Sequence, residues 1–536
     1  MRFSGPPLVQ TVDINDPLRI ALDTDPSGIA LQSVERSFTW AELEQSSLAL
    51  AQEYQQMGLR SGDRIASLMP NSVQLLIHYL AGLRLGLVCT PLNYRYRIPE
   101  IIHALDVSDA SCIIYHVERK NDIVTSLKKQ GRGLGHIKRI AMDDEEYQLL
   151  DEQNVDGKGE FSKKTWMTRE GLTETSLQQS ASHLGRTHTH LDPDQPCFIY
   201  FTSGSTGKPK GVTHTRKSFA WLLASVSEMT GLRAGEQIMP GSSLSHIASS
   251  ALALASLCHA ASVVVPVSLS CSCLETVLRR FSPQVMLALP VTLFALVRDQ
   301  RLRQHDFDSV RLCISGGDKV NHQLHTEFER ITGQRIDEGY GMSEIGFASL
   351  SPIHGENRMG SVGKLCPGFE GIIRSPDGQE LDVGEEGELW VRSPTMTCGY
   401  WGNSNATNET IQQGWLNTGD AMRFDEDGYL WFCGRRKQII VHDGSNICPQ
   451  DVEEALMEHP SVEQAGVIGI EDDVHGQNVH AYVCLKHELA VPTVPELINF
   501  ARERVGYKAP EVIQILPSLP INSVGKIDRV ALHSLQ

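Results

Sequence analysis

A glycine-rich loop directly after an apolar run is the feature that most restricts how this chain can fold. The run CFIY, residues 197–200, leads into FTSGSTGKPKGVTH, residues 201–214. Glycine lets backbone N–H groups approach phosphate oxygens closely, and the hydroxyl side chains and Lys210 can add donors and positive charge. The loop therefore predicts a phosphate-binding site.

The spacing within the loop excludes two common phosphate-binding motifs. A Walker A loop reads G-x-x-x-x-G-K-[ST], whereas Gly204 and Gly207 are separated by two residues and Lys208 is followed by Pro209. The dinucleotide pattern G-x-G-x-x-G is absent from this stretch as well. The chemistry must therefore be read from the rest of the chain.

Helix and strand patterns alternate along the N-terminal part, which favours a mostly parallel sheet covered by helices. At 536 residues the chain is too long for one core, so two or more domains are expected. The last hundred residues repeat a compact helix and strand pattern, which predicts a small α+β domain. The helices and strands on which these expectations depend are residues 43–58, 63–70, 72–86, 88–92 and 110–115 in the first part, and 451–459, 462–470, 481–486, 494–506 and 511–517 in the last.

Composition excludes several classes of function. Lys+Arg is 48 and Asp+Glu is 65, which gives a net charge of −17 and argues against general binding to nucleic acid or anionic membranes. The charge-free stretch 247–269 contains five serines and Pro266, so we expect a buried helix followed by a buried strand and no stable membrane insertion. With no secretory signal, the twelve cysteines are expected to be reduced thiols in the cytoplasm.

Five motifs in one order carry a family resemblance that runs from near residue 90 to Arg529. The loop FTSGSTGKPKGV resembles the phosphate loop of the adenylate-forming superfamily, which includes acyl-CoA synthetases, peptide-synthetase adenylation domains and firefly-type luciferases. The other motifs are SGGDKV (315–320), EGYGMSE (338–344), the TGD and GRxK elements within 415–437, and LPINSVGKIDR (519–529). The chain is most similar to an acyl- or aryl-CoA synthetase.

The resemblance implies an ATP site and a Mg²⁺ ligand. Tyr340 would stack on adenine, Glu338 would accept from its amine, Asp420 and Arg435 would hold the ribose, Ser343 would lie near the α-phosphate, and Glu344 would bind Mg²⁺. The remaining ATP-binding residues implied are Thr202, Ser203, Gly204, Ser205, Thr206, Gly207, Lys210, Gly316, Gly317, Asp318 and Gly339.

The resemblance also implies a fold and a moving part. The fold class is α/β, with a large N-terminal domain of mixed sheets flanked by helices plus a β-subdomain, over residues 1–434. A small mobile α+β domain follows over residues 435–536, with its hinge at Lys437. Lys526 would act on the substrate carboxylate and the α-phosphate, and Gly444 would line a CoA tunnel.

The expected reaction is ATP-dependent ligation of a small carboxylic acid to CoA, through an acyl-adenylate, with release of pyrophosphate and AMP. The stretch SSLSHIASSALAL has no acid that could pair with a substrate ammonium, and His246 would gate the acyl pocket. The acyl-pocket residues implied are His246, Ile247, Ser250, Gly317, Gly341 and Met342. Three alternatives remain: a ligase that loads a carrier-protein phosphopantetheine, a luciferase-like oxygenase, and a non-catalytic nucleotide-binding regulator.

Residues 143–195 differ from the rest of the chain. They are acidic, rich in Gln, Ser, Thr and His, and poorly periodic, so a surface excursion is expected there.

Overall fold

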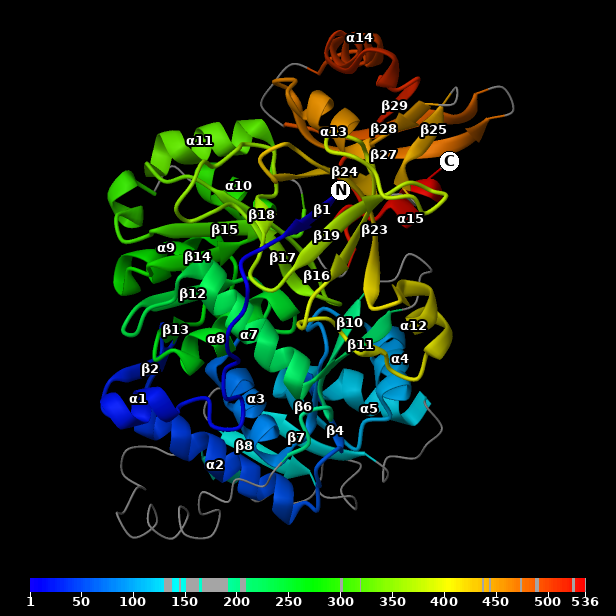
Figure 1. The fold of residues 1–536 in the computed structure, drawn as a ribbon. Coiled ribbons are helices and arrows are strands. Elements are labelled where there is room, and N and C mark those ends of the chain that lie inside the picture. Colours follow the sequence, from blue (N-terminus) through cyan, green and yellow to red (C-terminus); the bar gives the residue numbers. More distant parts are fainter. Residues whose placement is uncertain are drawn as a thin grey trace.

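Four sheets and the helices around them make up the computed structural model of this chain (Figure 1). The structure describes residues 1–129, 137–143, 146–150, 163–165, 191–202, 209–298, 302–318, 320–435, 438–442, 445–472, 475–486, 491–522 and 526–535.

The first nine-stranded sheet is parallel at its centre, as the alternating pattern of the N-terminal part predicts. Strands β5, β4, β6 and β7 are parallel neighbours, and β10 continues beside β5 before turning back as β11. The order is β21 (Gly399–Tyr400), β11 (Lys210–Thr215), β10 (Pro196–Thr202), β5 (Val88–Pro91), β4 (Arg64–Leu68), β6 (Cys112–His116), β7 (Lys138–Met142), β8 (Glu146–Leu150) and β9 (Lys163–Thr165).

The second nine-stranded sheet is parallel from β13 to β16 and has antiparallel strands at both edges. It carries two of the predicted motifs, at the end of β15 and along β16. The order is β18 (Lys364–Leu365), β17 (Gly346–Leu350), β16 (Asp337–Met342), β15 (Leu312–Gly316), β14 (Val285–Ala288), β12 (Gln237–Gly241), β13 (Ser262–Val264), β2 (Ile29–Gln32) and β3 (Ser37–Thr39).

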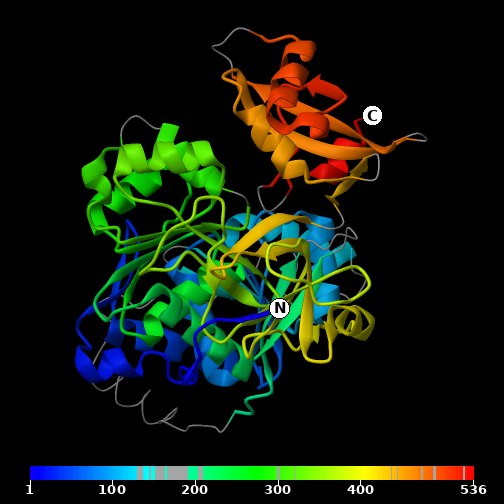
Figure 2. The ribbon, with the colours of Figure 1, turned by 45° about the horizontal axis from the view of Figure 1, so that its top comes forward.

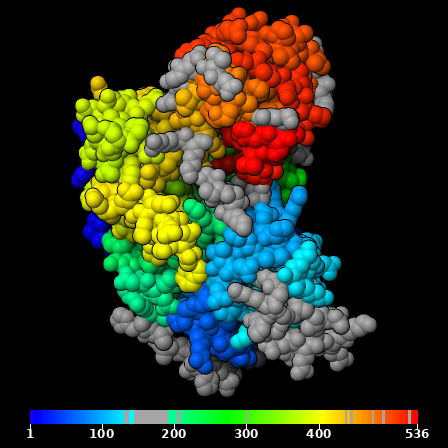
Figure 3. Space-filling model, turned by 90° about the vertical axis from the view of Figure 1, so that its right-hand side faces the viewer, coloured from blue at the N-terminus to red at the C-terminus, as the bar shows by residue number. Residues whose placement is uncertain are grey.

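Two smaller sheets complete the chain, and the second of them contains only residues after 439. The third sheet holds β1 (Arg2–Ser4), β19 (Glu370–Arg374), β20 (Gly387–Arg392), β23 (Trp415–Phe424), β22 (Ile411–Gln412) and β24 (Leu430–Arg435). The fourth holds β26 (Ser445–Ile447), β25 (Ile440–His442), β28 (Gly476–Leu485), β27 (Val462–Asp472) and β29 (Val512–Ile515). Figure 2 shows the fourth sheet and its helices, orange to red, gathered at one end of the molecule. Figure 3 shows their surface above the yellow segments around the third sheet.

The helices begin and end where the sequence supplies caps. The helix over Trp40–Gln56 starts with a capping box between Thr39 and Glu42, and the helix over Val73–Leu85 ends at Gly86 with φ +68°. The helices described are α1 (Arg19–Thr24), α2 (Trp40–Gln56), α3 (Val73–Leu85), α4 (Ile98–Ser108), α5 (Lys120–Lys129), α7 (Arg216–Thr230), α8 (Ile247–Cys258), α9 (Cys271–Phe281), α10 (Pro290–Arg298), α11 (His322–Thr332), α12 (Ser404–Thr410), α13 (Pro449–Met457), α14 (Val494–Val505) and α15 (Arg529–His533).

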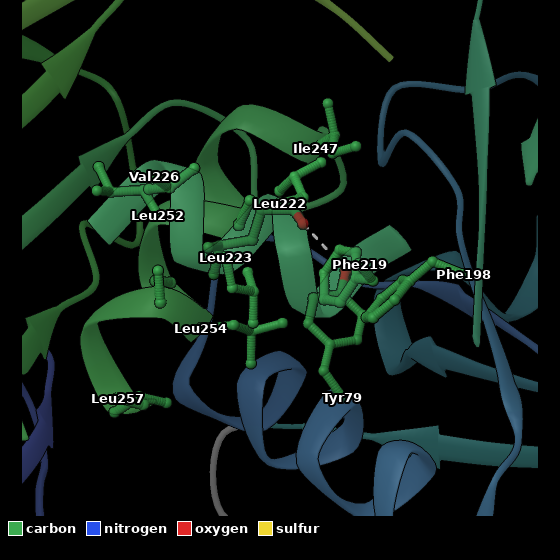
Figure 4. Close-up of a cluster of buried hydrophobic side chains, with 14 of the residues drawn as sticks. Tyr79, Phe198, Phe219, Leu222, Leu223, Val226, Ile247, Leu252, Leu254 and Leu257 are labelled. Atoms are coloured by element: carbon green, nitrogen blue, oxygen red, sulfur yellow. Dashed lines mark hydrogen bonds between the residues drawn. The ribbon is translucent and has the colours of Figure 1, made fainter. Parts of the chain in front are cut away.

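The main core lies where α7 and α8 pack on strands of both nine-stranded sheets. Figure 4 shows this contact, with aromatic rings from three elements meeting aliphatic side chains of α7 and α8. Phe198 of β10 lies 4.6 Å from Phe219 of α7 and 5.4 Å from Tyr79 of α3, measured between ring centroids. Burial of such rings fixes the two sheets relative to each other and so fixes the site between them.

The structure confirms several expectations and extends one. The charge-free stretch 247–269 forms helix α8 and strand β13, and no described helix is long and apolar enough to span a bilayer. All twelve cysteines are free thiols. Within 143–195, β8 and β9 add two antiparallel strands at the edge of the first sheet, which the polar sequence did not predict. Most of that stretch lies outside the described residues.

Candidate active site

Two strand ends of the second sheet approach each other so closely that only glycine fits between them. Gly316 ends β15 and pairs with Gly339 of β16, and a Cβ atom on Gly316 would lie 2.4 Å from the Gly339 carbonyl oxygen. Gly317 follows with φ +81°, a backbone conformation that favours glycine. The predicted residues Gly316, Gly317 and Asp318 therefore form the turn at the end of β15, and Gly316 lies directly against the predicted residue Gly339 within β16.

A triad of two buried residues, Tyr340 and Asp420, and the exposed Arg435 lies beside this turn. The Tyr340 hydroxyl donates to Asp420 Oδ2 at 2.6 Å, and Arg435 Nε lies 3.3 Å from Asp420 Oδ1. Asp420 and Arg435 are register partners on β23 and β24, so the third sheet supplies both. Burial raises the pKa of the Asp420 carboxyl above its usual range, while the charge of Arg435 lowers it. The structure thus brings together three residues that lie up to 95 positions apart in sequence.

The predicted metal ligand Glu344 is buried and held by a tyrosine. The Tyr400 hydroxyl donates to Glu344 Oε1 at 2.8 Å, and Lys210 Nζ lies 4.9 Å from the centroid of the Tyr400 ring. Burial raises the pKa of the Glu344 carboxyl above its usual range. Mg²⁺ is commonly held by one or two carboxylates together with substrate phosphates, so a buried carboxylate next to a phosphate loop fits that ion.

A buried histidine fixes the turn between Tyr340 and Glu344. His214, the last residue of the loop motif, lies on β11, and its Nε2 is 2.8 Å from the backbone carbonyl oxygen of Ser343. Burial lowers the pKa of His214 to about 4, so the ring is neutral at pH 7 and donates through Nε2. The contact ties Ser343, and with it Gly341 and Met342, to the strand that follows the phosphate loop.

The two ends of the phosphate loop are paired across an antiparallel ladder. Thr202 of β10 is the register partner of Lys210 of β11, and His103 Nε2 lies 2.7 Å from the Pro209 carbonyl oxygen. The predicted loop residues Ser203, Gly204, Ser205, Thr206 and Gly207 lie outside the described residues, as do the predicted hinge residue Lys437 and tunnel residue Gly444.

Three of the six predicted acyl residues lie at the start of α8, and the other three, Gly317, Gly341 and Met342, lie at the ends of β15 and β16. His246 is the N-cap residue of α8, and Ile247 and Ser250 are buried in the first turn. The Ser250 hydroxyl is engaged by the Tyr200 hydroxyl at 2.8 Å and by the His246 carbonyl at 3.0 Å. Burial lowers the pKa of His246 to about 4, and the nearby charges of Lys526 and Arg95 act in the same direction.

Lys526 reaches this centre from the far end of the chain. Its ammonium group donates to the backbone carbonyl of Gly317, 209 residues earlier. The Lys526 backbone N–H donates to Asn522 Oδ1 at 3.0 Å, which holds the loop that carries it. Burial lowers the pKa of Lys526, and the charges of Asp318 and Asp420 oppose that shift. The last motif therefore meets the strand-end turn and the Asp420 triad.

The family follows from comparison with known proteins. The family model described as AMP-binding enzyme matches residues 18–401, and the model of the AMP-binding enzyme C-terminal domain matches residues 451–526. The chain belongs to the AMP-binding enzyme family.

Two relatives and one solved structure are similar to this AMP-binding enzyme over almost its whole length. It is 30% identical over 509 residues to a feruloyl-CoA synthase of an Amycolatopsis species, with 94% of each chain covered. It is 29% identical over 519 residues to a long-chain-fatty-acid–CoA ligase of Escherichia coli O157:H7, covering 92% of this chain and 89% of that protein. The crystal structure of ATP-bound MatB from Rhodopseudomonas palustris superposes with a TM-score of 0.83 at 23% identity, covering 98% of this chain and 99% of that one. The last likeness shows a shared fold.

Two residues at the site of this AMP-binding enzyme were not found from its sequence. Tyr400 lies in CGYW, which has no hydrophobic period, and it reaches Glu344 only because β21 pairs with β11. His325 lies on α11 and contacts Glu338 at 2.7 Å. The position of His325 on the buried face of an amphipathic helix was a signal available from sequence, because a histidine there needs a partner.

Proposed function

We propose that this chain is a carboxylic acid:CoA ligase that forms AMP. The observation that carries the proposal is the arrival of Lys526 at the Gly317 carbonyl, next to the triad of Tyr340, Asp420 and Arg435. The ammonium group of Lys526 lies beside the hydrogen-bond donors and acceptors of this triad. Such an arrangement suits a reaction at a phosphoryl centre. The two named relatives, a fatty acid ligase and an aromatic acid ligase, both support the same reaction class.

In the first step, an oxygen of the substrate carboxylate attacks the α-phosphorus of ATP. The bond from that phosphorus to the bridging oxygen breaks, and pyrophosphate leaves with the electron pair. Charge on the α-phosphoryl oxygens grows during the attack, so the ammonium of Lys526 stabilises the transition state more than the ground state. Tyr340, Asp420 and Arg435 would hold the nucleoside so that the α-phosphate faces Lys526.

Glu344 would hold Mg²⁺ together with the nucleotide phosphates. When bound, the ion neutralises phosphate charge and makes pyrophosphate a better leaving group. The loop over residues 202–210 would guide the β- and γ-phosphates, with Thr202 and Lys210 at its two ends. Lys210 faces Tyr400, so its position is coupled to the carboxylate of Glu344.

In the second step, the thiolate of CoA attacks the acyl carbon, and the bond to the phosphate oxygen of AMP breaks. Lys526 contacts the Gly317 carbonyl in this structure, beside the proposed reacting centre. We therefore propose that residues 435–536 form the mobile domain, that residues 1–434 form the other, and that the chain turns at Lys437 to withdraw Lys526 and admit the thiol along Gly444. The neutral ring of His246 would gate the acyl pocket without adding a cation beside Lys526.

The substrate is proposed to be a carboxylic acid whose acyl or aryl chain is uncharged. The described residues of α8 include no carboxylate that could pair with a substrate ammonium. A cytoplasmic location is part of the proposal, and twelve free thiols support it because stable disulfides are rare there.

A pyrophosphate-release assay tests the proposed function. Purified protein is given ATP and Mg²⁺ with a panel of straight-chain fatty acids and aromatic acids, each with and without CoA. We expect at least one acid to release pyrophosphate and to form its CoA thioester. Adenylation that gives no CoA thioester would favour a carrier-protein ligase, and light or oxygen uptake would favour the oxygenase. If none of the acids in the panel led to release of pyrophosphate, the proposal would be contradicted.

A further inference from the structure

Glu338, the residue expected to accept from the adenine amine, is held from behind by a histidine. His325 Nε2 lies 2.7 Å from Glu338 Oε1, and both side chains are at most 5% exposed. The Gly360 backbone N–H also points to Oε1, at 3.4 Å. Two donors on one oxygen fix the carboxylate plane, since rotation would break both contacts.

Glu338 has two other hydrogen-bond acceptors, its backbone carbonyl and Oε2. The backbone carbonyl accepts from the N–H of Ser351, the residue after β17, at 2.8 Å and is therefore already engaged. Oε2 receives no hydrogen bond from any described residue. Glu338 and Tyr340 are two positions apart on β16 and so point to the same face of the strand. Oε2 is therefore the acceptor available to a base that stacks on Tyr340.

We propose that His325 is a positioning residue that fixes the direction of the Glu338 carboxylate and thereby sets the preference for adenine. This inference rests on the ATP site of the proposed function. The adenine 6-amino group is a donor that a carboxylate oxygen accepts, whereas the 6-oxo group of hypoxanthine is an acceptor that the same oxygen repels. A carboxylate free to rotate would not hold one oxygen toward the base, and the two donors at Oε1 prevent that rotation.

Nucleotide binding measured by calorimetry without any acid substrate tests the inference apart from ligation. ATP and inosine triphosphate are each titrated into the wild type and the variants in the presence of Mg²⁺. For the wild type we expect a preference for ATP of about 10- to 100-fold, the usual worth of one hydrogen bond to a charged acceptor. His325→Leu is expected to lower that preference about tenfold, whereas His325→Gln, which keeps an N–H donor, should retain it.

Replacing Glu338 gives the variant whose base preference tests the inference most directly. In Glu338→Gln, the His325 N–H selects the amide oxygen as its acceptor, so the amide NH₂ points to the base and the preference should shift toward inosine triphosphate. In the double variant His325→Leu with Glu338→Gln, only the longer contact from the Gly360 N–H, at 3.4 Å, still orients the amide, and the two nucleotides should bind within about threefold of each other. His322→Leu, an exposed histidine one turn earlier on α11, is the matched control and should bind as the wild type does.

The outcomes separate the inference from the proposed function. An unchanged ratio of the two affinities in His325→Leu, with both affinities lowered equally, would mean that the histidine only joins α11 to β16 and would overturn the inference. Equal shifts in Glu338→Gln with and without His325 would overturn it as well. Selective binding of ATP that depends on His325, in a protein that ligates no acid, would uphold the inference and refute the proposed function.

Discussion

Tyr400 contacts both Glu344, the proposed Mg²⁺ ligand, and Lys210 of the proposed phosphate loop. Its hydroxyl donates to the Glu344 carboxylate at 2.8 Å, and its ring lies under the Lys210 ammonium at 4.9 Å. A hydrogen bond to a charged group and a cation–π contact are separable by mutation, because phenylalanine keeps the ring and loses the hydroxyl. At the scale of the residue, Tyr400 therefore gives the clearest test of how the Mg²⁺ ligand is held.

We expect Tyr400→Phe to raise the Mg²⁺ concentration needed for half-maximal pyrophosphate release by about 3- to 30-fold, from the usual worth of a hydrogen bond to a charged acceptor. Tyr400→Leu should in addition raise the KM for ATP, since Lys210 loses its ring. Direct Mn²⁺ binding measured by electron paramagnetic resonance gives a readout independent of turnover. If Tyr400→Phe needs the same Mg²⁺ concentration as the wild type and binds Mn²⁺ equally well, the hydroxyl does not position Glu344.

Most of the candidate site could be predicted at this scale, and the exceptions share one cause. Tyr340, Asp420 and Arg435 were named from the sequence because each belongs to a local motif, and the structure brings them together. Tyr400 and His325 were missed because their roles depend on contacts with Glu344 and Glu338 made through strand pairing and helix packing. No pattern within a short stretch of the sequence predicts a contact of this kind.

At the scale of the element, β11 and the turn after β16 form one unit through His214. The ring is completely buried, and its Nε2–H donates to the Ser343 carbonyl. Because burial lowers the pKa of His214 to about 4, the unfolded chain binds a proton below pH 6.5 that the folded chain does not. His78, with a pKa of about 3, acts in the same direction.

Stability should therefore be complete above about pH 6.5 and should fall as the pH drops toward 4, by up to about 1.4 kcal/mol per pH unit for each such histidine. His214→Gln keeps an N–H donor for the Ser343 carbonyl and cannot titrate. Urea unfolding at several pH values should show a shallower loss of stability in this variant than in the wild type. Parallel curves for the two proteins would mean that His214 is not part of the acid response.

Helices and strands could be predicted from the sequence where burial imposes a regular pattern of apolar residues, and they could not be predicted where it does not. The charge-free stretch 247–269 was correctly divided into a helix and a strand because its character changes from Ala and Leu to three valines. Strands β8 and β9, with the sequences EYQLL and KKT, were not foreseen. They are the last two strands at one edge of the first sheet, where β8 pairs with β7 and β9, and this backbone pairing needs no alternation of apolar residues.

At the scale of the whole molecule, polar contacts between described residues join the C-terminal elements to the rest of the chain, and one of them is the His322 backbone N–H donating to Glu454 Oε1 at 3.4 Å. Lys526 donates to the Gly317 carbonyl, and Arg298 at the end of α10 lies 3.2 Å from Glu463 of β27. The ion pair is partly exposed, so its contribution to stability is small, about 0–1 kcal/mol. A weak ion pair suits the proposed mechanism, in which this arrangement opens in every cycle.

Arg298→Glu should slow acyl-adenylate formation about two- to fivefold, in keeping with the modest worth of a surface ion pair. The exchanged pair Arg298→Glu with Glu463→Arg should recover the wild-type rate. Thioester formation from supplied acyl-adenylate should not slow in either variant, because the pair belongs to the arrangement that adenylates. No recovery in the exchanged pair would show that the two charges do not act on each other.

The central claim is that one lysine serves one of two half-reactions and leaves for the other. Lys526→Ala is measured twice: for pyrophosphate release from ATP and acid, and for thioester formation from supplied acyl-adenylate and CoA. Loss of a donor to developing charge should cut the first rate by about 10²–10³, whereas the second should stay within about threefold of wild type. Lys437→Pro at the proposed hinge should show the reverse pattern. Equal losses in both half-reactions for Lys526→Ala would contradict the account.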